Sequence, residues 1–509
     1  MSGRPPRPGP RPRRLAFRIA VGCCVVTLFA PIAARADDPP VVISAADQLE
    51  AYYDRALEES VLDNRLDVTL GRGAYTLGAS FLSHSPSDAG RLDPNDFGAQ
   101  TQGIRKRWLE AATDDWTVRV GDVYSTYGRG LALSIFEDQT VDFDNVLDGV
   151  MARGALGPAE LRVIAGTNSI GDEFQVLKGA RLDLRGDRWG RFGLQGVWSD
   201  STSVGGIGRP GGDRLYGSSW ERSVSDFADV YGEYVIRHPE NYRAGARQGP
   251  DGHGGYGSLA LYLGRVQVLA EYKDLLRYQL PFVNPPTTVR QHTTTLMNRG
   301  GHTPNIRLDD ERGGLIEAQF QLAEATRVVS SYSKTEARQS NQPSWEVYGE
   351  LEQDVGESLE LFLKGGETEE TVLEGENPVF FERRNAVAQA IWRVDDTWSI
   401  EGTFETQAVQ ESNRGTAQFR FPLEFSNHLI STTVSRAPNL SLALTTEWTD
   451  DDRPEDDLWV WGECNLRLGD RRQLLLGGGR LRGGQLCSGG VCKLVDPFEG
   501  GRIEFLTTF

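Results

Sequence analysis

The last nine residues, Gly501-Arg502-Ile503-Glu504-Phe505-Leu506-Thr507-Thr508-Phe509, indicate the fold most directly. Read at period two, one face carries Ile503, Phe505, Thr507 and Phe509, and the other carries Arg502, Glu504, Leu506 and Thr508. The pattern predicts a β-strand that ends the chain on an aromatic residue. It suits the edge strand of a soluble sheet or the closing strand of a membrane barrel, so the rest of the chain has to decide.

Alternating segments of about ten residues fill the chain from residue 48 onwards. The clearest pair is Ser258–Lys273, where two alternating runs flank a tight turn at Gly264-Arg265. Each run has one apolar face and one largely polar face. The same pattern recurs near residues 116–120, 180–184, 316–322, 345–352, 359–364, 398–405 and 458–468.

The connections between these segments are alternately short and long. The long ones cover about 85–103, 121–147, 200–213, 239–254, 275–312, 367–383, 407–427 and 483–500. This alternation of short and long connections is typical of an all-β transmembrane antiparallel β-barrel with short periplasmic turns and long external loops. The number of alternating segments predicts about 22–24 strands. Residues 37–63 are either a periplasmic N-terminal segment or the first strand, and Asp47–Ser60 suits a helix equally well.

The N-terminus predicts export. Residues 1–36 combine an arginine-rich start, an apolar stretch and the small-residue site Ala34-Arg35-Ala36, as in a cleaved signal peptide. The mature chain, 37–509, then holds the barrel. The formal net charge of −18 argues against nucleic acid as a partner, and no long apolar helix remains after cleavage.

Two sets of residues resemble bacterial outer-membrane barrels. Ile503, Phe505 and Phe509 resemble the C-terminal assembly signal of such proteins. Residues 119–133, 142–149, 284–305 and 487–492 are similar to a family of uncharacterised, porin-like outer-membrane barrels. The resemblance implies location and fold, but no reaction. Expected partners are outer-membrane lipid and lipopolysaccharide, the barrel-assembly machinery and periplasmic chaperones, with the oligomeric state left open.

The polar faces of the strands predict which residues line the lumen. The predicted lining acids are Asp183, Glu233, Glu271, Glu317, Glu346, Glu350, Glu352, Glu360, Glu401, Glu405 and Glu463. The predicted lining bases are Arg119, Arg181, Lys273, Lys364 and Arg467. Because acids outnumber bases, we expect an acidic lumen with a weak preference for cations.

Residues 119–149 leave two interpretations open. They either fold inward as a constriction, with Arg129, Asp142, Asp144 and Asp148 facing the pore, or form an external surface loop. The acidic run at 450–457 suits a solvated loop better than a calcium site, because it lacks the spacing of one. The histidines lack zinc-site spacing, and we expect no cofactor, metal or catalytic site.

Cys487 and Cys492 bracket Ser-Gly-Gly-Val in the last long connection. An oxidising compartment favours a disulfide between them.

Two functions fit these patterns. A barrel this wide cannot be filled by its own side chains, so it must conduct, hold a plug or be closed by loops. The first hypothesis is a channel or importer for small polar or ionic solutes. The alternative is a surface scaffold or adhesion barrel that binds partners through its long loops.

Overall fold

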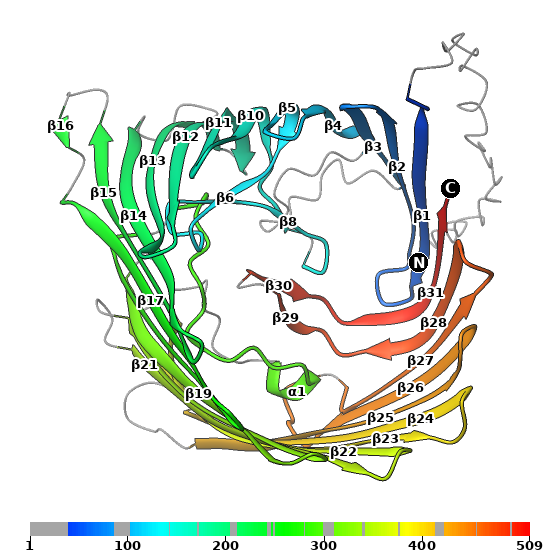
Figure 1. Ribbon diagram of the computed structural model, residues 1–509. Coiled ribbons are helices and arrows are strands. Elements are labelled where there is room, and N and C mark those ends of the chain that lie inside the picture. Colours follow the sequence, from blue (N-terminus) through cyan, green and yellow to red (C-terminus); the bar gives the residue numbers. More distant parts are fainter. Residues whose placement is uncertain are drawn as a thin grey trace, which may run out of the picture.

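The chain forms one closed antiparallel β-barrel of 24 strands, at the upper end of the predicted number. The computed structural model describes residues 39–85, 102–141, 143–170, 173–203, 211–241, 246–247, 250–278, 280–298, 310–337, 342–374, 377–412, 422–454, 456–488 and 491–509. Figure 1 looks along the barrel and shows the strands as a continuous ring.

The wall strands follow one another in sequence order. Their bounds are β1 (Val42–Asp54), β2 (Glu59–Arg72), β3 (Tyr75–Ser85), β4 (Gln102–Ala112), β5 (Trp116–Val123), β10 (Leu147–Leu156), β11 (Ala159–Ile170), β12 (Glu173–Gly186), β13 (Gly190–Ser203), β14 (Gly211–Ser225), β15 (Ala228–Asn241), β17 (Gly252–Leu263), β18 (Val266–Leu276), β19 (Glu311–Ala323), β20 (Thr326–Ala337), β21 (Gln342–Val355), β22 (Leu359–Glu374), β23 (Asn377–Arg393), β24 (Trp398–Ser412), β25 (Pro422–Arg436), β26 (Leu440–Thr449), β27 (Leu458–Arg467), β28 (Arg472–Leu481) and β31 (Phe498–Thr508). The two-residue β16 (Ala246–Arg247) pairs with β15 at its end.

The C-terminal strand closes the barrel. β31 pairs with β28 on one side and with β1 on the other, from Ala46 opposite Thr508 to Asp54 opposite Gly500. The backbone N–H of Phe509 donates to the carbonyl of Ala45 at 2.8 Å. Region 37–63 therefore supplies β1 and the start of β2, and Asp47–Ser60 is not helical.

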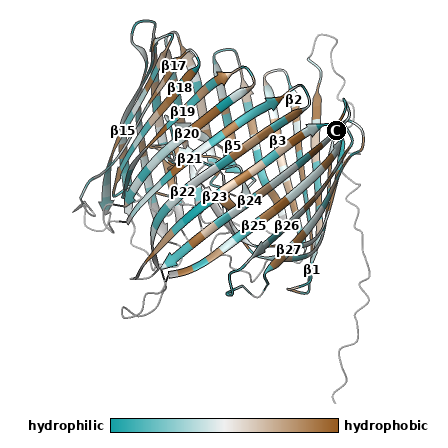
Figure 2. Cartoon of the chain, turned by 90° about the horizontal axis from the view of Figure 1, so that it is seen from below, coloured by the Kyte–Doolittle hydropathy of each residue, from teal (hydrophilic) through white to brown (hydrophobic). Residues whose placement is uncertain are grey.

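Alternation along the strands sets the two faces of the wall. On β22, Leu363 is exposed on the outer face, whereas Thr368 and Glu370 of the opposite parity are buried. Figure 2 shows apolar and polar stretches interleaved along the tilted strands. An outer face rich in aliphatic and aromatic residues is what contact with lipid requires.

The two ends of the barrel differ as predicted. One end, where both β1 begins and β31 ends, has only turns of two to four residues. Gly264 in one of them has φ of 68°, a left-handed conformation that glycine adopts without strain. All longer connections lie at the other end.

One expected long loop is instead an extended hairpin. β22 continues to Glu374 and β23 starts at Asn377, although 367–383 is predicted as a loop. Strand pairing continues past the apolar part of the wall because cross-strand ion pairs support it. Arg383 pairs with Glu370 at 3.1 Å, and Arg384 with Glu367 at 3.3 Å.

Three segments lie inside the ring (Figure 1). The inner loop, 124–146, carries β6 (Ser125–Tyr127), β7 (Leu133–Ile135), β8 (Glu137–Asp138) and β9 (Phe143–Asp144). The inner strap, 278–298, ends in the one-turn helix α1 (Thr295–Asn298). The end hairpin consists of β29 (Gly484–Ser488) and β30 (Val491–Val495). No helix in the described part of the chain is long and apolar enough to cross a membrane.

The main apolar core lies within the barrel, between the wall and these segments. It joins the inner loop and inner strap to inward residues of β5 and of β10 to β18. The wall contributes Val123, Leu147, Ile164, Leu177, Val197, Leu215, Tyr231, Val235, Tyr256 and Leu275. The inner face is therefore polar over only part of the wall, and its apolar part packs against the inner loop and the inner strap.

Candidate functional site: the barrel interior

The inner loop is fixed to the wall at its glycine turn. The carboxylate of Glu233 on β15 accepts the backbone N–H of Arg129 at 2.7 Å and the hydroxyl of Tyr231 at 2.7 Å. Gly128 makes this approach possible, since its φ is 59° and a Cβ there would lie 2.4 Å from the Glu233 carboxylate oxygens. The glycine turn thus wraps a buried carboxylate.

The inner loop and inner strap form one body. The Tyr278 hydroxyl donates to the carbonyl of Leu131 at 2.8 Å, and the Ser134 N–H donates to the carbonyl of Phe282 at 2.8 Å. The two backbones also touch at Gly130, where a Cβ would lie 2.4 Å from the Asn284 carbonyl oxygen. Two connections far apart in sequence are therefore joined by direct hydrogen bonds.

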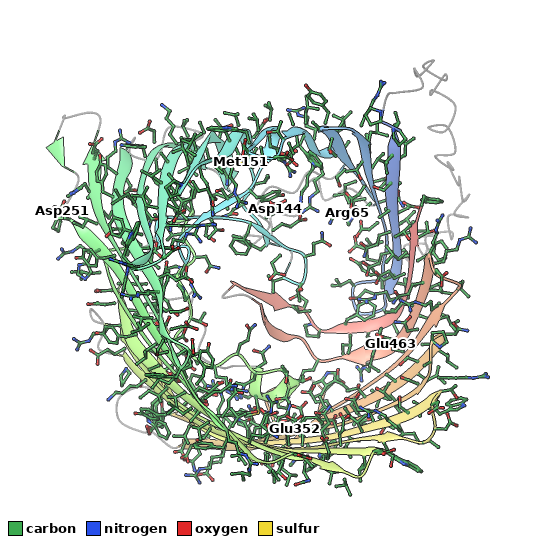
Figure 3. All side chains as sticks on the ribbon, viewed as in Figure 1. Arg65, Asp144, Met151, Asp251, Glu352 and Glu463 are labelled. Carbon is green, nitrogen blue, oxygen red and sulfur yellow. The ribbon has the colours of Figure 1, made fainter. Side chains whose placement is uncertain are left out.

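The tip of the inner loop reaches the wall on the β2–β4 side. Lys106 Nζ lies 2.5 Å from Glu137 and 3.1 Å from Asp144, and Arg65 lies 3.6 Å from Glu137. Figure 3 places Arg65 and Asp144 in the interior. Burial, reinforced by the Asp144 and Glu137 carboxylates, raises the pKa of the Tyr124 phenol well above its usual value. Tyr124 therefore stays protonated and donates to Asp144.

The other proposed constriction residues are placed differently. Arg129 is in the interior, with its guanidinium over the Tyr231 ring at 4.7 Å. Asp148 is on the same face of β10 as the exposed Val150, pairs with the exposed Arg107, and so faces away from the interior. Alternation across β10 explains this, because Met151 of the opposite parity packs on the inner core. Asp142 lies outside the described residues.

The inner strap is bound by glutamates of the facing wall. Arg290 pairs with Glu317 and, at 3.3 Å, with Glu350. His292 lies 2.9 Å from Glu346.

At the start of α1, the Glu405 carboxylate accepts the N–H groups of Thr295 and Leu296 at 3.1 and 2.7 Å. The negative charge suits the N-terminal N–H groups of this turn, which have no intrahelical acceptor. Together with Glu317, Glu346 and Glu350, this makes four predicted lumen acids that hold the inner strap.

The remaining predicted lumen residues are spread over the wall. Arg119 stacks on the Trp108 ring at 4.1 Å. Three acids form ion pairs: Asp183 with Arg181 and Arg191, Glu352 with Arg327 at 2.6 Å, and Glu360 with Arg393. Two others accept hydrogen bonds, Glu271 from Tyr256 and Glu401 from Gln389 at 2.7 Å. Figure 3 places Glu352 and Glu463 on the wall. Many of these acids therefore have a cationic neighbour, which weakens the field they create.

Sequence reasoning missed a group of arginines on β10 to β13. Arg153, Arg162, Arg185 and Arg191 surround the one predicted there, Arg181. Arg162 alternates with Leu161 and Val163, so period two could have placed it on an inner face. Their assembly across three hairpins depends on strand register, which no local pattern supplies.

The backbone places Cys487 of β29 opposite Cys492 of β30 in the end hairpin. Directly opposed residues of an antiparallel pair are at a separation that a disulfide can span. The side chains of these two residues lie outside the described part of the structure, and the bond stays a prediction. Among the described residues no group of three or more His, Cys, Asp or Glu is arranged to hold a metal ion.

Comparison with known proteins gives one sequence match. Residues 54–187 match a family of unknown function, DUF6029. That range includes 119–149, so the predicted resemblance to an uncharacterised family is confirmed. No curated protein matches the chain significantly.

Several solved structures are similar at low identity. The copper transporter OprC is 10% identical with a TM-score of 0.46, over 94% of this chain and 82% of that one. The outer membrane transporter YddB from Escherichia coli is 8% identical with a TM-score of 0.45, over 94% and 81%. A BenF-like porin from Pseudomonas fluorescens Pf-5 is 10% identical with a TM-score of 0.38, over 70% and 99%.

A closed wall with an apolar outer face and a largely polar inner face is the architecture of an outer-membrane β-barrel.

Proposed function

We propose that the protein is an outer-membrane channel or importer for small polar or ionic solutes. The observation that carries this proposal is the folding of two external connections into the barrel, where Glu233, Glu405 and Lys106 anchor them. A barrel that only displayed its loops would have no need to hold them inside. A narrowed polar interior favours small solutes over macromolecules.

We further propose a weak preference for cations. Glu401 and Glu463 have no ion-pair partner among the described side chains, whereas Glu350, Glu352 and Glu360 each have an arginine neighbour. Partial pairing supports a modest preference, and screening over about 8 Å at physiological salt reduces it further.

The test is electrical recording of the purified protein in a planar bilayer. The expected result is sustained single-channel steps, with a small reversal potential of cationic sign under a salt gradient that shrinks as total salt rises. Silence from correctly folded, heat-modifiable protein would contradict the channel and favour the scaffold. A preference for anions would contradict the proposed cation preference but not the proposed channel.

A further inference from the structure

An arginine cluster lies on the inner wall toward the short-turn end of β10 to β13. Arg153, Arg162 and Arg181 stand directly opposite one another across three strands, and Arg185 stands opposite Arg191. All five share the inward parity: Arg153 lies two residues from Met151, and Arg181 and Arg185 share their face with the buried Leu177. We call these five residues the arginine cluster.

This arrangement works against the stability of the sheet. Like charges directly opposite each other on neighbouring strands are destabilising, by roughly 0.2–1 kcal/mol each in ordinary cases. Three such pairs occur here within four strands. A sequence optimised only for stability would alternate the signs, so the cluster indicates a function.

Three carboxylates partly neutralise the cluster. Glu160 accepts from Arg153 at 2.9 Å, Arg162 at 2.7 Å and Arg185 at 3.1 Å. Asp183 binds Arg181 at 2.7 Å and Arg191 at 3.1 Å, and Glu221 of β14 stands directly opposite Arg191. Five guanidinium groups thus face three carboxylates, which leaves an excess of positive charge on this wall.

The excess charge is accessible. Arg153 and Arg185 are 57% and 61% exposed, while Glu160 between them is 10% exposed. Each guanidinium has five N–H donors, and each of these two uses one on Glu160 within the described part of the chain. The cluster therefore presents oriented donors around an already saturated carboxylate.

The cluster lies in the barrel interior. The inner loop lies next to it, since the Tyr127 hydroxyl would be 3.1 Å from a Cβ on Gly179, two residues from Arg181. In Figure 1, β10 to β13 form the wall facing β22 to β25 across the interior. That facing wall carries Glu401, which has no ion-pair partner among the described side chains, and Glu360, which Arg393 partly neutralises. A positive wall and a weakly negative wall thus face each other across the barrel.

We propose that the arginine cluster binds an oxyanion group, a carboxylate or a phosphate, of the transported solute. Guanidinium forks match the geometry of both groups. The proposal rests on the proposed function in taking the anion to be part of a permeating solute. A solute that also carries a positive group would be oriented by the acidic wall opposite, so the two walls together favour a dipolar solute.

The test measures binding of radiolabelled inorganic phosphate to the purified barrel in non-ionic detergent, by equilibrium dialysis at low salt. The test variant is Arg153→Gln/Arg185→Gln. The matched control is Arg327→Gln/Arg393→Gln, which removes two exposed arginines of other strands, each paired with one glutamate. Both variants lose the same charge.

We expect the wild type and the control to bind phosphate alike, and the test variant to bind it about ten-fold more weakly, as the loss of charged hydrogen bonds predicts. Displacement by succinate more strongly than by unlabelled phosphate identifies a carboxylate solute, and the reverse order a phosphate one. Absence of binding by the wild type, or equal losses in both variants, would overturn the proposal. The binding assay does not depend on ion conduction. A protein that binds phosphate but gives no current in a planar bilayer would therefore contradict the proposed channel and leave the proposed anion site standing.

Discussion

Lys106 on β4 and Glu137 at the tip of the inner loop lie 2.5 Å apart, so a wall strand holds the far end of a loop that originates at β5. Asp144 adds a second carboxylate at 3.1 Å. The ammonium therefore holds the tip of the inner loop against β4.

The first prediction follows from this contact. Lys106→Met should release the tip and raise the fraction of time spent in a larger-conductance state by about ten-fold, the effect of losing charged contacts worth about 1.5–3 kcal/mol. Single-channel recording measures it. Arg107→Met is the control, because Arg107 pairs with Asp148 on the outer face. An equal rise of the larger-conductance state in both variants would show that the effect comes from β4 and not from release of the inner loop.

The second prediction concerns the turn around Glu233. Gly128→Ala should lower the free energy of unfolding by about 1–3 kcal/mol, because it adds a clash to the cost of a left-handed residue. Gly264→Ala is the control, since Gly264 has φ of 68° with nothing within 4 Å of a Cβ. Denaturant unfolding in detergent compares them. Equal losses would mean that the contact with Glu233 contributes nothing.

The third prediction separates charge from anchoring among the glutamates. Glu401→Gln/Glu463→Gln should shift the reversal potential toward anions and leave the conductance unchanged. Glu346→Gln/Glu350→Gln/Glu352→Gln should shift it too and also alter the conductance, because Glu346 and Glu350 hold the inner strap through His292 and Arg290. An unchanged reversal potential in both variants would place these acids off the conducting path.

The fourth prediction concerns the closing strand. Removal of residues 501–509 deletes most of β31, the strand that pairs with both β1 and β28. This truncation should abolish accumulation of the protein in the outer membrane. Deletion of Phe509 alone should reduce it several-fold, and Phe509→Tyr should not. Immunoblots of outer-membrane fractions measure the amounts. Wild-type levels of folded barrel without Phe509 would remove the assembly role from this residue.

The fifth prediction concerns the end hairpin. Alkylation of the unreduced protein followed by mass spectrometry should label Cys464, a free thiol, and leave Cys487 and Cys492 joined. A disulfide closing so short a loop should add only about 2 kcal/mol of stability, so Cys487→Ser/Cys492→Ser should still insert. Alkylated Cys487 and Cys492 would show that the register alone does not produce the bond.

Alternation in the sequence is enough to predict the barrel and its closing strand. The period of two is a local property, and each strand displays it without reference to its neighbours. The predicted loop at 367–383 is instead a paired hairpin, because cross-strand ion pairs hold it, and a local pattern does not show which charges become partners.

The interior could not be predicted in the same way. Leu177, Val197 and Leu215 look like ordinary strand residues, and nothing near them identifies Leu133 or Phe282 as their partners. The arginine cluster could not be predicted for the same reason, because Arg153, Arg162 and Arg181 become neighbours only through the register of the paired strands. Long-range packing decided both features, and a single sequence carries little information about it.

The apolar core inside the barrel also sets an order of folding. Its residues come from β5, from β10 to β18, from the inner loop and from the inner strap, so the surface on which the two segments rest exists only after those strands have paired. The two segments therefore pack in the aqueous interior and not against lipid. None of these strands is β1 or β31, so the interior packing does not depend on the pairing that closes the wall.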